Sequence, residues 1–189
     1  MTKSEIRASM RLRLSAVSDH ERDLASAAVC ERVRDLVRQL AAPLVAFYAA
    51  ANRELNLAEL LPWFDSCGVR TMLPRRAGAS YEMARFHVGD DLVTGPYGIQ
   101  QPAEQAERVP QSDSVHAVWL VPGVAFGRNG ARVGHGGGYY DQLLAAVTGP
   151  RVAIAYDCQI LSFIPMEQHD VPMTHFITQT SLLKIQTES

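Results

Sequence analysis

The feature that most constrains this chain is a glycine-rich run at 132–141, which reads RVGHGGGYYD. Four glycines fall within five residues, after an apolar segment and before a helical pattern. Glycine lets a backbone adopt positive φ and approach a ligand closely. A glycine-rich turn between a strand and a helix collects unpaired N–H groups at the positive end of the helix dipole, and such turns bind phosphate. The run therefore predicts a phosphate-binding loop.

Two common phosphate loops do not fit this run. No Lys-Ser or Lys-Thr pair follows the last glycine, which excludes a Walker A loop. The glycine spacing over 134–138 differs from that of the dinucleotide fingerprint, and the run comes late in the chain. The loop must therefore belong to another class.

The residues flanking the glycines could complete a nucleotide site. Arg132 could reach a transferring phosphoryl group with its planar set of donors. Asp141 is expected in the first helical turn, where a carboxylate beside phosphates is a natural Mg²⁺ ligand. Singly, Asp141 could be a helix-start residue and the glycines a tight turn. Together, the arginine, the glycines, two tyrosines and the aspartate favour nucleotide binding.

Composition restricts the class of protein. The 189 residues fit one domain, 1–189, and 47% of them are hydrophobic, which is enough for a core. A net charge of −2 offers no basic field for nucleic acid or a membrane, and no apolar run reaches spanning length. Three scattered cysteines and six histidines form no disulfide or zinc pattern. We expect a cytoplasmic protein without a signal peptide.

Helix and strand patterns alternate along the chain. Helices are predicted after capping boxes at Thr2/Glu5 and Ser18/Glu21, and over 57–67 and 139–147. Apolar runs predict strands at 44–49, 69–73, 115–121, 152–156 and 175–178, with an antiparallel or edge strand at 81–88. Pro62 should kink its helix, and Pro74 should stop its strand. The alternation predicts an α/β fold with a mainly parallel sheet covered on both faces.

Helical spacing in the second helix assigns core positions to Leu24, Ala28, Val33, Leu36, Val37 and Leu40.

Ligands of open parallel sheets lie beyond the carboxyl ends of the strands, which places Glu54 near a substrate. Helix-start chemistry is an equal alternative for Glu54. Arg75 and Arg76 could meet an anionic substrate tail, although such residues are more often solvated. The segment 89–110 lacks periodicity, and long loops of this kind are often functional.

The glycine run also carries a family resemblance. The segment 122–126 reads PGVAF, and together with Gly130 and the run 132–141 it resembles the signature of the 5-formyltetrahydrofolate cyclo-ligases. The resemblance extends over most of the chain and implies a three-layer α/β/α sandwich. It implies that ATP and 5-formyltetrahydrofolate give ADP, phosphate and 5,10-methenyltetrahydrofolate. Phosphorylating the formyl oxygen would activate the carbon and create a leaving group, so the protein mainly positions reactants and neutralises charge.

The resemblance also implies roles for single residues. The catalytic residues would be Arg132 and Lys3, and magnesium would be held by Asp141 and Asp170. The reduced folate would contact Ala49, Glu54 and Tyr97, whose ring can stack on a pterin. ATP would contact Lys3, Ser4, Glu5, Ile6, Arg7, Arg132, Val133, Gly134, His135, Gly136, Gly137, Gly138, Tyr139 and Tyr140. From the residues alone, Lys3 and Arg7 fit a solvated basic helix face, and Tyr97 could pack its own loop. We expect a monomer that requires ATP and Mg²⁺.

Three positions depart from the family pattern. Gly127 stands where aspartate is common, His135 where a basic or tyrosyl residue is usual, and Thr174 where aspartate is common. Gly127 removes a carboxylate from the turn beside the phosphate loop. Two rival functions stay open: an enzyme of the same architecture acting on a sugar phosphate or CoA thioester, and a non-catalytic folate or ATP binder. The pairs Lys3/Arg7 and Asp141/Asp170 argue against the first, and only Gly127 favours the second.

Overall fold

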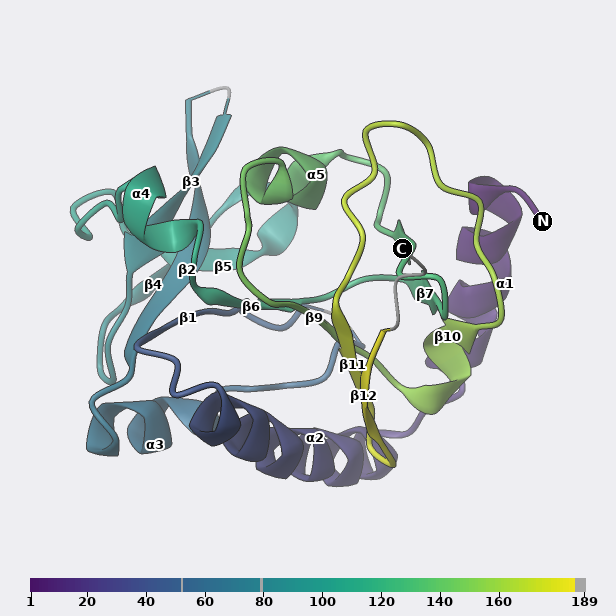
Figure 1. Cartoon of the computed structure of the whole chain (residues 1–189), viewed down its shortest axis with the longest axis horizontal. Helices are drawn as coiled ribbons and strands as arrows, with labels where there is room; N and C mark the ends of the chain where they lie inside the picture. The colour runs from purple at the N-terminus through teal and green to yellow at the C-terminus, as the bar shows by residue number, and fades with distance from the viewer. Residues whose placement is uncertain (52, 79, 186–189) are drawn as a thin grey trace.

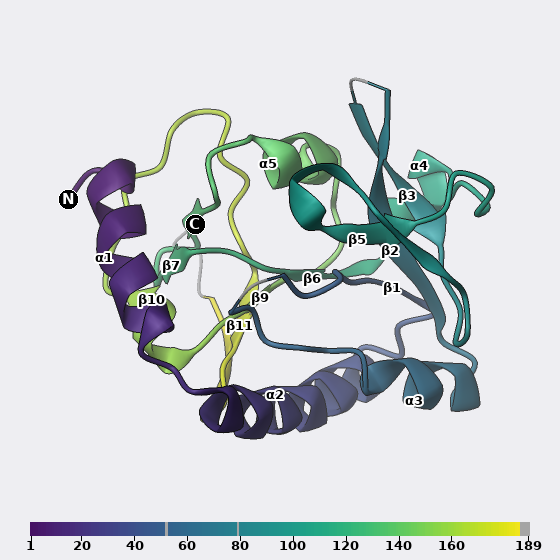
Figure 2. The same cartoon turned by 180° about the vertical axis from the view of Figure 1, so that it is seen from behind.

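The centre of the molecule is a seven-stranded sheet of order β12-β11-β9-β6-β1-β2-β3 (Figures 1 and 2). The computed structural model describes residues 1–51, 53–78 and 80–185, with Tyr97 described for its backbone only. The strands of this sheet are β1 (Leu44–Ala46), β2 (Arg70–Ala77), β3 (Ser80–Arg85), β6 (Val118–Val121), β9 (Arg151–Ile154), β11 (His175–Ile177) and β12 (Leu182–Lys184). The five inner strands are parallel and the two edge strands are antiparallel. The predicted mainly parallel sheet is confirmed.

Helices cover both faces of this sheet (Figure 1). The helices are α1 (Lys3–Ser15), α2 (Asp19–Gln39), α3 (Leu60–Ser66), α4 (Gln111–Ser114) and α5 (Tyr139–Leu144), with 3₁₀ turns η1 (Pro96–Gly98) and η2 (Asp157–Gln159). α2 and α3 lie against one face, and α4 and α5 lie on the other side. Both capping boxes are present, at Thr2/Glu5 and Ser18/Glu21. None of the helices described is long and apolar enough to cross a membrane.

The side chains of the strands alternate between two cores. One core joins α2 and α3 to the sheet through Val45, Val118, Leu120, Val152, Ile154 and Ile177. The other joins α5 to it through Leu44, Ala46, Trp119, Val121, Ala153 and Phe176. A third, smaller cluster packs Ile6 and Met10 of α1 against Val133 and its neighbours. Because strand side chains point alternately to opposite faces, two helical layers sandwich the sheet, and the predicted three-layer fold is confirmed.

Some predicted details are wrong. Leu24 and Leu40 are 59% and 38% exposed, because the buried stripe of α2 is displaced to Ala25, Ser26, Val29, Cys30, Val33, Leu36 and Val37. Pro62 does not kink its helix. Because α3 starts at Leu60, Pro62 lies in its first turn, where backbone N–H groups have no acceptor within the helix. β2 continues through Pro74, because β1 ends opposite Met72. Beyond that point β2 pairs with β3 alone and is in effect an edge strand, and edge strands tolerate proline.

The segment 89–110 is more ordered than its sequence indicates. It contains an antiparallel hairpin of β4 (Leu92–Thr94) and β5 (Gln100–Pro102). Arg75 is only 7% exposed, and its Nη1 donates to the carbonyls of Ala103, Glu104 and Ala106 at 2.6, 2.8 and 2.9 Å. Its Nε donates to Glu82 at 2.9 Å. Arg75 therefore holds this segment against β2, and its donors are directed at the protein itself.

A small second sheet, of order β10-β7-β8, supports the glycine run. It consists of β7 (Ala125–Gly127), β8 (Arg132–Val133) and β10 (Ile160–Leu161). Asn129 lies in the turn between β7 and β8, and its side chain ties this turn to the backbone of Ile164. Its Nδ2 donates to the Ile164 carbonyl at 2.9 Å, and its Oδ1 accepts from the Ile164 N–H at 3.3 Å. A Cβ on Gly127 would overlap Asn129 Oδ1. The Asn129 side chain thus shapes the turn that lacks the aspartate common at position 127.

Gly127→Ala is expected to lower the free energy of unfolding by about 1–3 kcal/mol. The added Cβ would meet Asn129 and lie 2.9 Å from the Ile164 backbone nitrogen, so backbone must shift. Urea unfolding measures the loss. Gly137→Ala is the matched control, because a Cβ there meets no atom within 4 Å. Equal unfolding free energies for the two variants would contradict this account of the turn.

Candidate active site

The glycine loop connects β8 to α5 and presents unpaired backbone donors. Within the described residues, none of the N–H groups of 134–138 has a protein acceptor. Gly136 and Gly138 have φ values of +104° and +65°, which other residues adopt with strain. α5 has six residues, so the expected helix dipole is small and the donors are mainly those of the loop itself. This geometry suits an anion with several oxygens.

Arg132 lies beneath this loop. Its side chain is 6% exposed and its Nη2 donates to Asp141 Oδ1 at 2.9 Å. The guanidinium also stacks 5.3 Å from the ring centre of Tyr140. A Cβ on Gly134 would lie 2.7 Å from Arg132 Nη1, so the absence of a side chain at 134 lets the guanidinium reach the loop. Arg132 and Asp141, which the sequence predicts as separate ligands of a phosphoryl group and of Mg²⁺, are therefore in direct contact.

Helix α1 brings two more cations to the site. Arg7 Nε donates to the Gly134 carbonyl at 2.7 Å. Lys3 Nζ donates to both Asp170 oxygens, at 3.0 and 2.8 Å, and lies 3.5 Å from Glu167. Burial acts to lower the pKa of Lys3, but its hydrogen bond and charge pairing with Asp170 outweigh this and the pKa is raised. Lys3 and Arg7 thus both bond other parts of the protein, which argues against a freely solvated basic face.

The pairing also changes the acid behaviour of Asp170. Burial acts to raise the pKa of Asp170, but hydrogen bonds from Lys3 and from the Glu167 N–H hold the pKa below its usual value. A carboxyl whose pKa is lowered by folding stabilises the fold above its unfolded-state pKa, and this stability is lost as pH falls through the lowered value. We therefore expect acid to weaken the attachment of α1 to the segment 167–170.

Urea unfolding as a function of pH tests this expectation. The wild-type protein should be more stable than Asp170→Asn near neutral pH, and the difference should shrink as the pH falls below about 4. The contribution of Lys3 to stability is lost only as the pH rises through the raised Lys3 pKa. The difference in unfolding free energy between wild type and Asp170→Asn should therefore be constant from about pH 4 up to the alkaline range in which Lys3 loses its proton. A difference that does not change in acid would contradict the assignment.

Glu167, His169 and Asp170 form the only group of three or more potential metal ligands found among the described residues, with ligand atoms within 4.8 Å of one another. His169 Nε2 lies 3.2 Å from Glu167 and 4.0 Å from Asp170. Sequence reasoning found Asp170 and missed Glu167, although the spacing Glu-x-His-Asp could have indicated it. Asp141 is not in this group, and its carboxylate is bonded to Arg132.

Among the predicted folate residues, Glu54 approaches the glycine loop. Glu54 Oε2 accepts from the Ala51 N–H at 2.9 Å, and Glu54 Oε1 lies 3.6 Å from His135 Nε2. His135 is 71% exposed, so this contact leaves it accessible. Ala49 follows β1 and is half-buried. The backbone of Tyr97 lies in η1, and its side chain falls outside the described structure. The contact between Glu54 and His135 has no signal in the sequence.

The remaining predicted site residues lie on the same two elements. On α1, Glu5 caps the helix through Thr2, Ser4 is exposed, and the Ile6 side chain is buried in the core. At the two ends of the loop, Val133 of β8 is buried, and the ring of Tyr139 of α5 lies 3.9 Å from that of Tyr81. The structure therefore brings α1, the glycine loop, and the turn containing Glu54 together.

Thr174, a departure from the family pattern, bonds the backbone of Arg151. Its Oγ1 accepts from the Arg151 N–H at 2.9 Å and donates to the Arg151 carbonyl at 3.1 Å.

Comparison with known proteins gives a consistent result. The model of the 5-formyltetrahydrofolate cyclo-ligase family matches residues 1–179. A 5-formyltetrahydrofolate cyclo-ligase from Mycolicibacterium smegmatis is 34% identical over 145 residues, which cover 71% of this chain and 72% of the relative. A second, from Haemophilus influenzae, is 27% identical and covers 90% of this chain and 92% of its own.

A solved structure agrees with these sequence matches. The NMR structure of Aquifex aeolicus 5,10-methenyltetrahydrofolate synthetase has a TM-score of 0.86 and 31% identity, covering 100% of this chain and 95% of its own. The fold similarity thus extends over the whole molecule, and the family model spans both α1 and the glycine loop. This chain belongs to the 5-formyltetrahydrofolate cyclo-ligase family of enzymes.

Proposed function

We propose that this chain, as a single domain over 1–189, cyclises 5-formyltetrahydrofolate to 5,10-methenyltetrahydrofolate with Mg-ATP as co-substrate. The observation that carries this proposal is the approach of Glu54 to His135 of the glycine loop, with 3.6 Å between their side-chain atoms. A carboxylate suited to the amino groups of a pterin thereby lies beside a loop suited to phosphate. Such a reaction requires that the formyl group and the γ-phosphate meet.

The residues present fit ATP. The loop N–H groups of 134–138 are free of protein acceptors among the described residues, and a Cβ at Gly137 or Gly138 would meet open space. Arg7 and Arg132 contact this loop or its flank, and Lys3 lies one helical turn before Arg7 on α1. Backbone amides and arginine forks are the donors that phosphate oxygens prefer. Contacts with ATP are therefore proposed for α1 residues 3–7 and for residues 132–140.

The carboxylates also fit magnesium. Mg²⁺ prefers oxygen ligands and commonly takes one or two carboxylates together with substrate phosphates. Asp141 and Asp170 would supply these carboxylates, and Glu167 lies close enough to Asp170 to join it. Each of the two aspartates contacts a cation, Arg132 or Lys3. Arg132 and Lys3 would thereby lie close enough to donate to the phosphates as well.

ATP supplies a phosphoryl group that activates the formyl oxygen as a leaving group. Arg132 and Lys3 would neutralise the charge that builds up on the phosphoryl oxygens during transfer. Glu54, Ala49 and Tyr97 would hold the reduced folate with its formyl group toward the loop. No covalent nucleophile is needed, because orientation and charge neutralisation supply the rate enhancement. We further propose a monomer that works in the cytoplasm, without a nucleic acid or membrane partner.

The first experiment mixes purified protein with Mg-ATP and 5-formyltetrahydrofolate and follows the near-ultraviolet absorbance of the methenyl product. We expect an absorbance rise that requires ATP and Mg²⁺ and is matched by ADP release. A flat trace from folded protein would overturn the proposal. Melting shifts with folate, ATP and sugar phosphates would then distinguish a binding protein from an enzyme with another phosphorylated substrate.

A further inference from the structure

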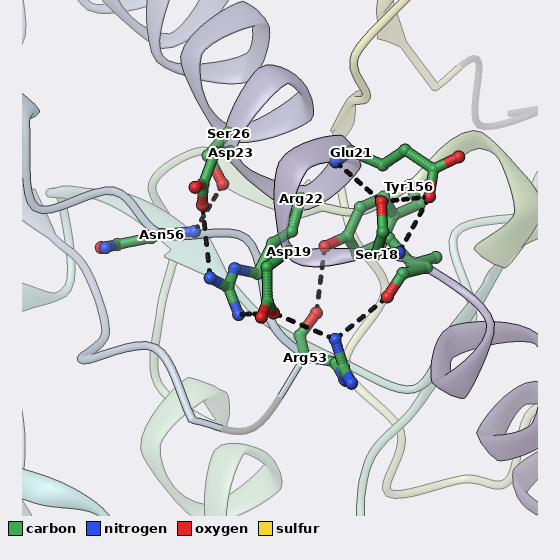
Figure 3. A network of polar contacts seen from close by, with 10 residues as sticks. Ser18, Asp19, Glu21, Arg22, Asp23, Ser26, Arg53, Asn56 and Tyr156 are labelled. Carbon is green, nitrogen blue, oxygen red and sulfur yellow. Dashed lines mark hydrogen bonds and ion pairs between the residues drawn. The ribbon is translucent and has the colours of Figure 1, made fainter.

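Two buried tyrosine hydroxyls hold the backbone on both sides of Glu54. Tyr48 Oη donates to the Leu55 carbonyl at 2.7 Å, and Tyr156 Oη donates to the Arg53 carbonyl at 3.1 Å. Figure 3 shows the second contact together with the polar network around it. The two tyrosines follow different strands, β1 and β9, and are 5% and 4% exposed. Both hydroxyls thus reach the same short turn from separate parts of the fold.

The turn depends on such contacts because it has no regular secondary structure. From Ala49 to Asn56 the described residues belong to no helix or strand, so their carbonyls find no ladder partners. Further bonds come from α2 and the residue before its N-cap. Ser26 Oγ accepts from the Asn56 N–H at 3.0 Å (Figure 3). Arg53 Nη1 donates to the Val17 carbonyl at 3.0 Å. These bonds act on the Arg53 side chain and on the Asn56 N–H. The tyrosine bonds act on the two residues adjacent to Glu54.

The hydroxyls are suited to this task. Burial raises the pKa of both Tyr48 and Tyr156, and the nearby charge of Glu54 adds to the rise for Tyr48, so both hydroxyls stay protonated donors. Packing alone would be served equally well by phenylalanine, whose ring fills the same volume. The oxygen atoms therefore contribute the bonds to the turn. The chemistry proposed above uses neither hydroxyl.

We propose that Tyr48 and Tyr156 are positioning residues that aim Glu54 at the reduced folate and at the glycine loop. This inference rests on the proposed function. With the carbonyls on both sides of Glu54 fixed, Oε2 keeps its bond to the Ala51 N–H and Oε1 stays 3.6 Å from His135. Releasing either carbonyl lets the carboxylate move, and a misplacement of about 1 Å is enough to weaken its hydrogen bonds to the folate.

The experiment compares Tyr48→Phe and Tyr156→Phe with the wild-type enzyme. We expect each variant to raise the folate KM, and the folate Kd measured by calorimetry without ATP, about tenfold. The ATP KM should stay within about twofold, since the bonds of Arg7 and Arg132 are untouched. Thr71→Val is the matched control, because it also removes a buried hydroxyl bonded to a backbone carbonyl, that of Phe86, away from this turn. It should lower stability without changing either KM.

A double-mutant cycle with Glu54→Gln separates positioning from general destabilisation. If the tyrosines act through Glu54, adding Tyr156→Phe to Glu54→Gln should raise the folate Kd by less than about twofold. Additive effects, or variants that keep the wild-type folate KM and Kd while the wild type turns over, would overturn this inference alone. A wild-type protein that neither binds nor converts the folate would overturn the proposed function and this inference together.

Discussion

Asp141→Asn is expected to lower the turnover number by about 100-fold or more while the protein stays folded. In the proposed site, Asp141 supplies a charged oxygen to Mg²⁺, and an amide is a much weaker ligand for this hard cation. Asparagine is chosen over alanine because its carbonyl can still accept from Arg132, which donates to Asp141 at 2.9 Å. Removing the acceptor would leave a buried guanidinium unpaired and confuse catalysis with stability. ADP release and product absorbance measure the effect.

Two comparisons make the Asp141 result specific. Asp157→Asn is the control, since Asp157 is an exposed aspartate whose carboxylate accepts from Thr180 and lies in neither proposed ligand set. It should keep wild-type turnover. In Asp141→Asn, the Mg²⁺ concentration that gives half-maximal activity should rise. Wild-type turnover in Asp141→Asn would remove Asp141 from the site.

The glycine run allowed much of the site to be anticipated because its elements are local in sequence. Arg132, the glycines and Asp141 occupy ten consecutive positions, so their contact follows from a single turn between β8 and α5. Capping boxes at Thr2/Glu5 and Ser18/Glu21 are local as well, and both are present. The parallel sheet was also predictable, because alternating apolar strands and helices leave few other topologies.

Features that depend on distant segments were not predictable. The effect of Pro74 depends on where β1 ends, and that is a property of the sheet register. In the sequence Arg75 is indistinguishable from a solvated residue, because its acceptors, the carbonyls of Ala103, Glu104 and Ala106, come from a distant segment. The Lys3–Asp170 pair joins residues 167 positions apart. The approach of Glu54 to His135 joins two turns that no local pattern relates. Such contacts form only when the layers pack, so propensity and spacing carry no trace of them.

Arg132→Met is expected to reduce the turnover number by about 1000-fold, with a smaller change in the ATP KM. Arg132 is 6% exposed beneath the glycine loop, where charge on the transferring phosphoryl group would be screened little by water. A cation in this position stabilises the transition state more than bound ATP, so its loss acts mainly on kcat. Methionine retains much of the packing against Tyr140 and removes the charge.

Two variants separate the charge of Arg132 from its shape. Arg132→Lys keeps a cation but loses the planar fork that can bond Asp141 and a phosphate together, so its turnover should lie between those of Arg132→Met and wild type. Arg128→Met, at an exposed position on the adjacent turn, should leave turnover unchanged. A rise in the ATP KM with kcat unchanged would indicate that Arg132 contributes only ground-state binding of ATP. Wild-type turnover in Arg132→Met would exclude the residue from catalysis, since no other buried cation contacts Asp141 within the described chain.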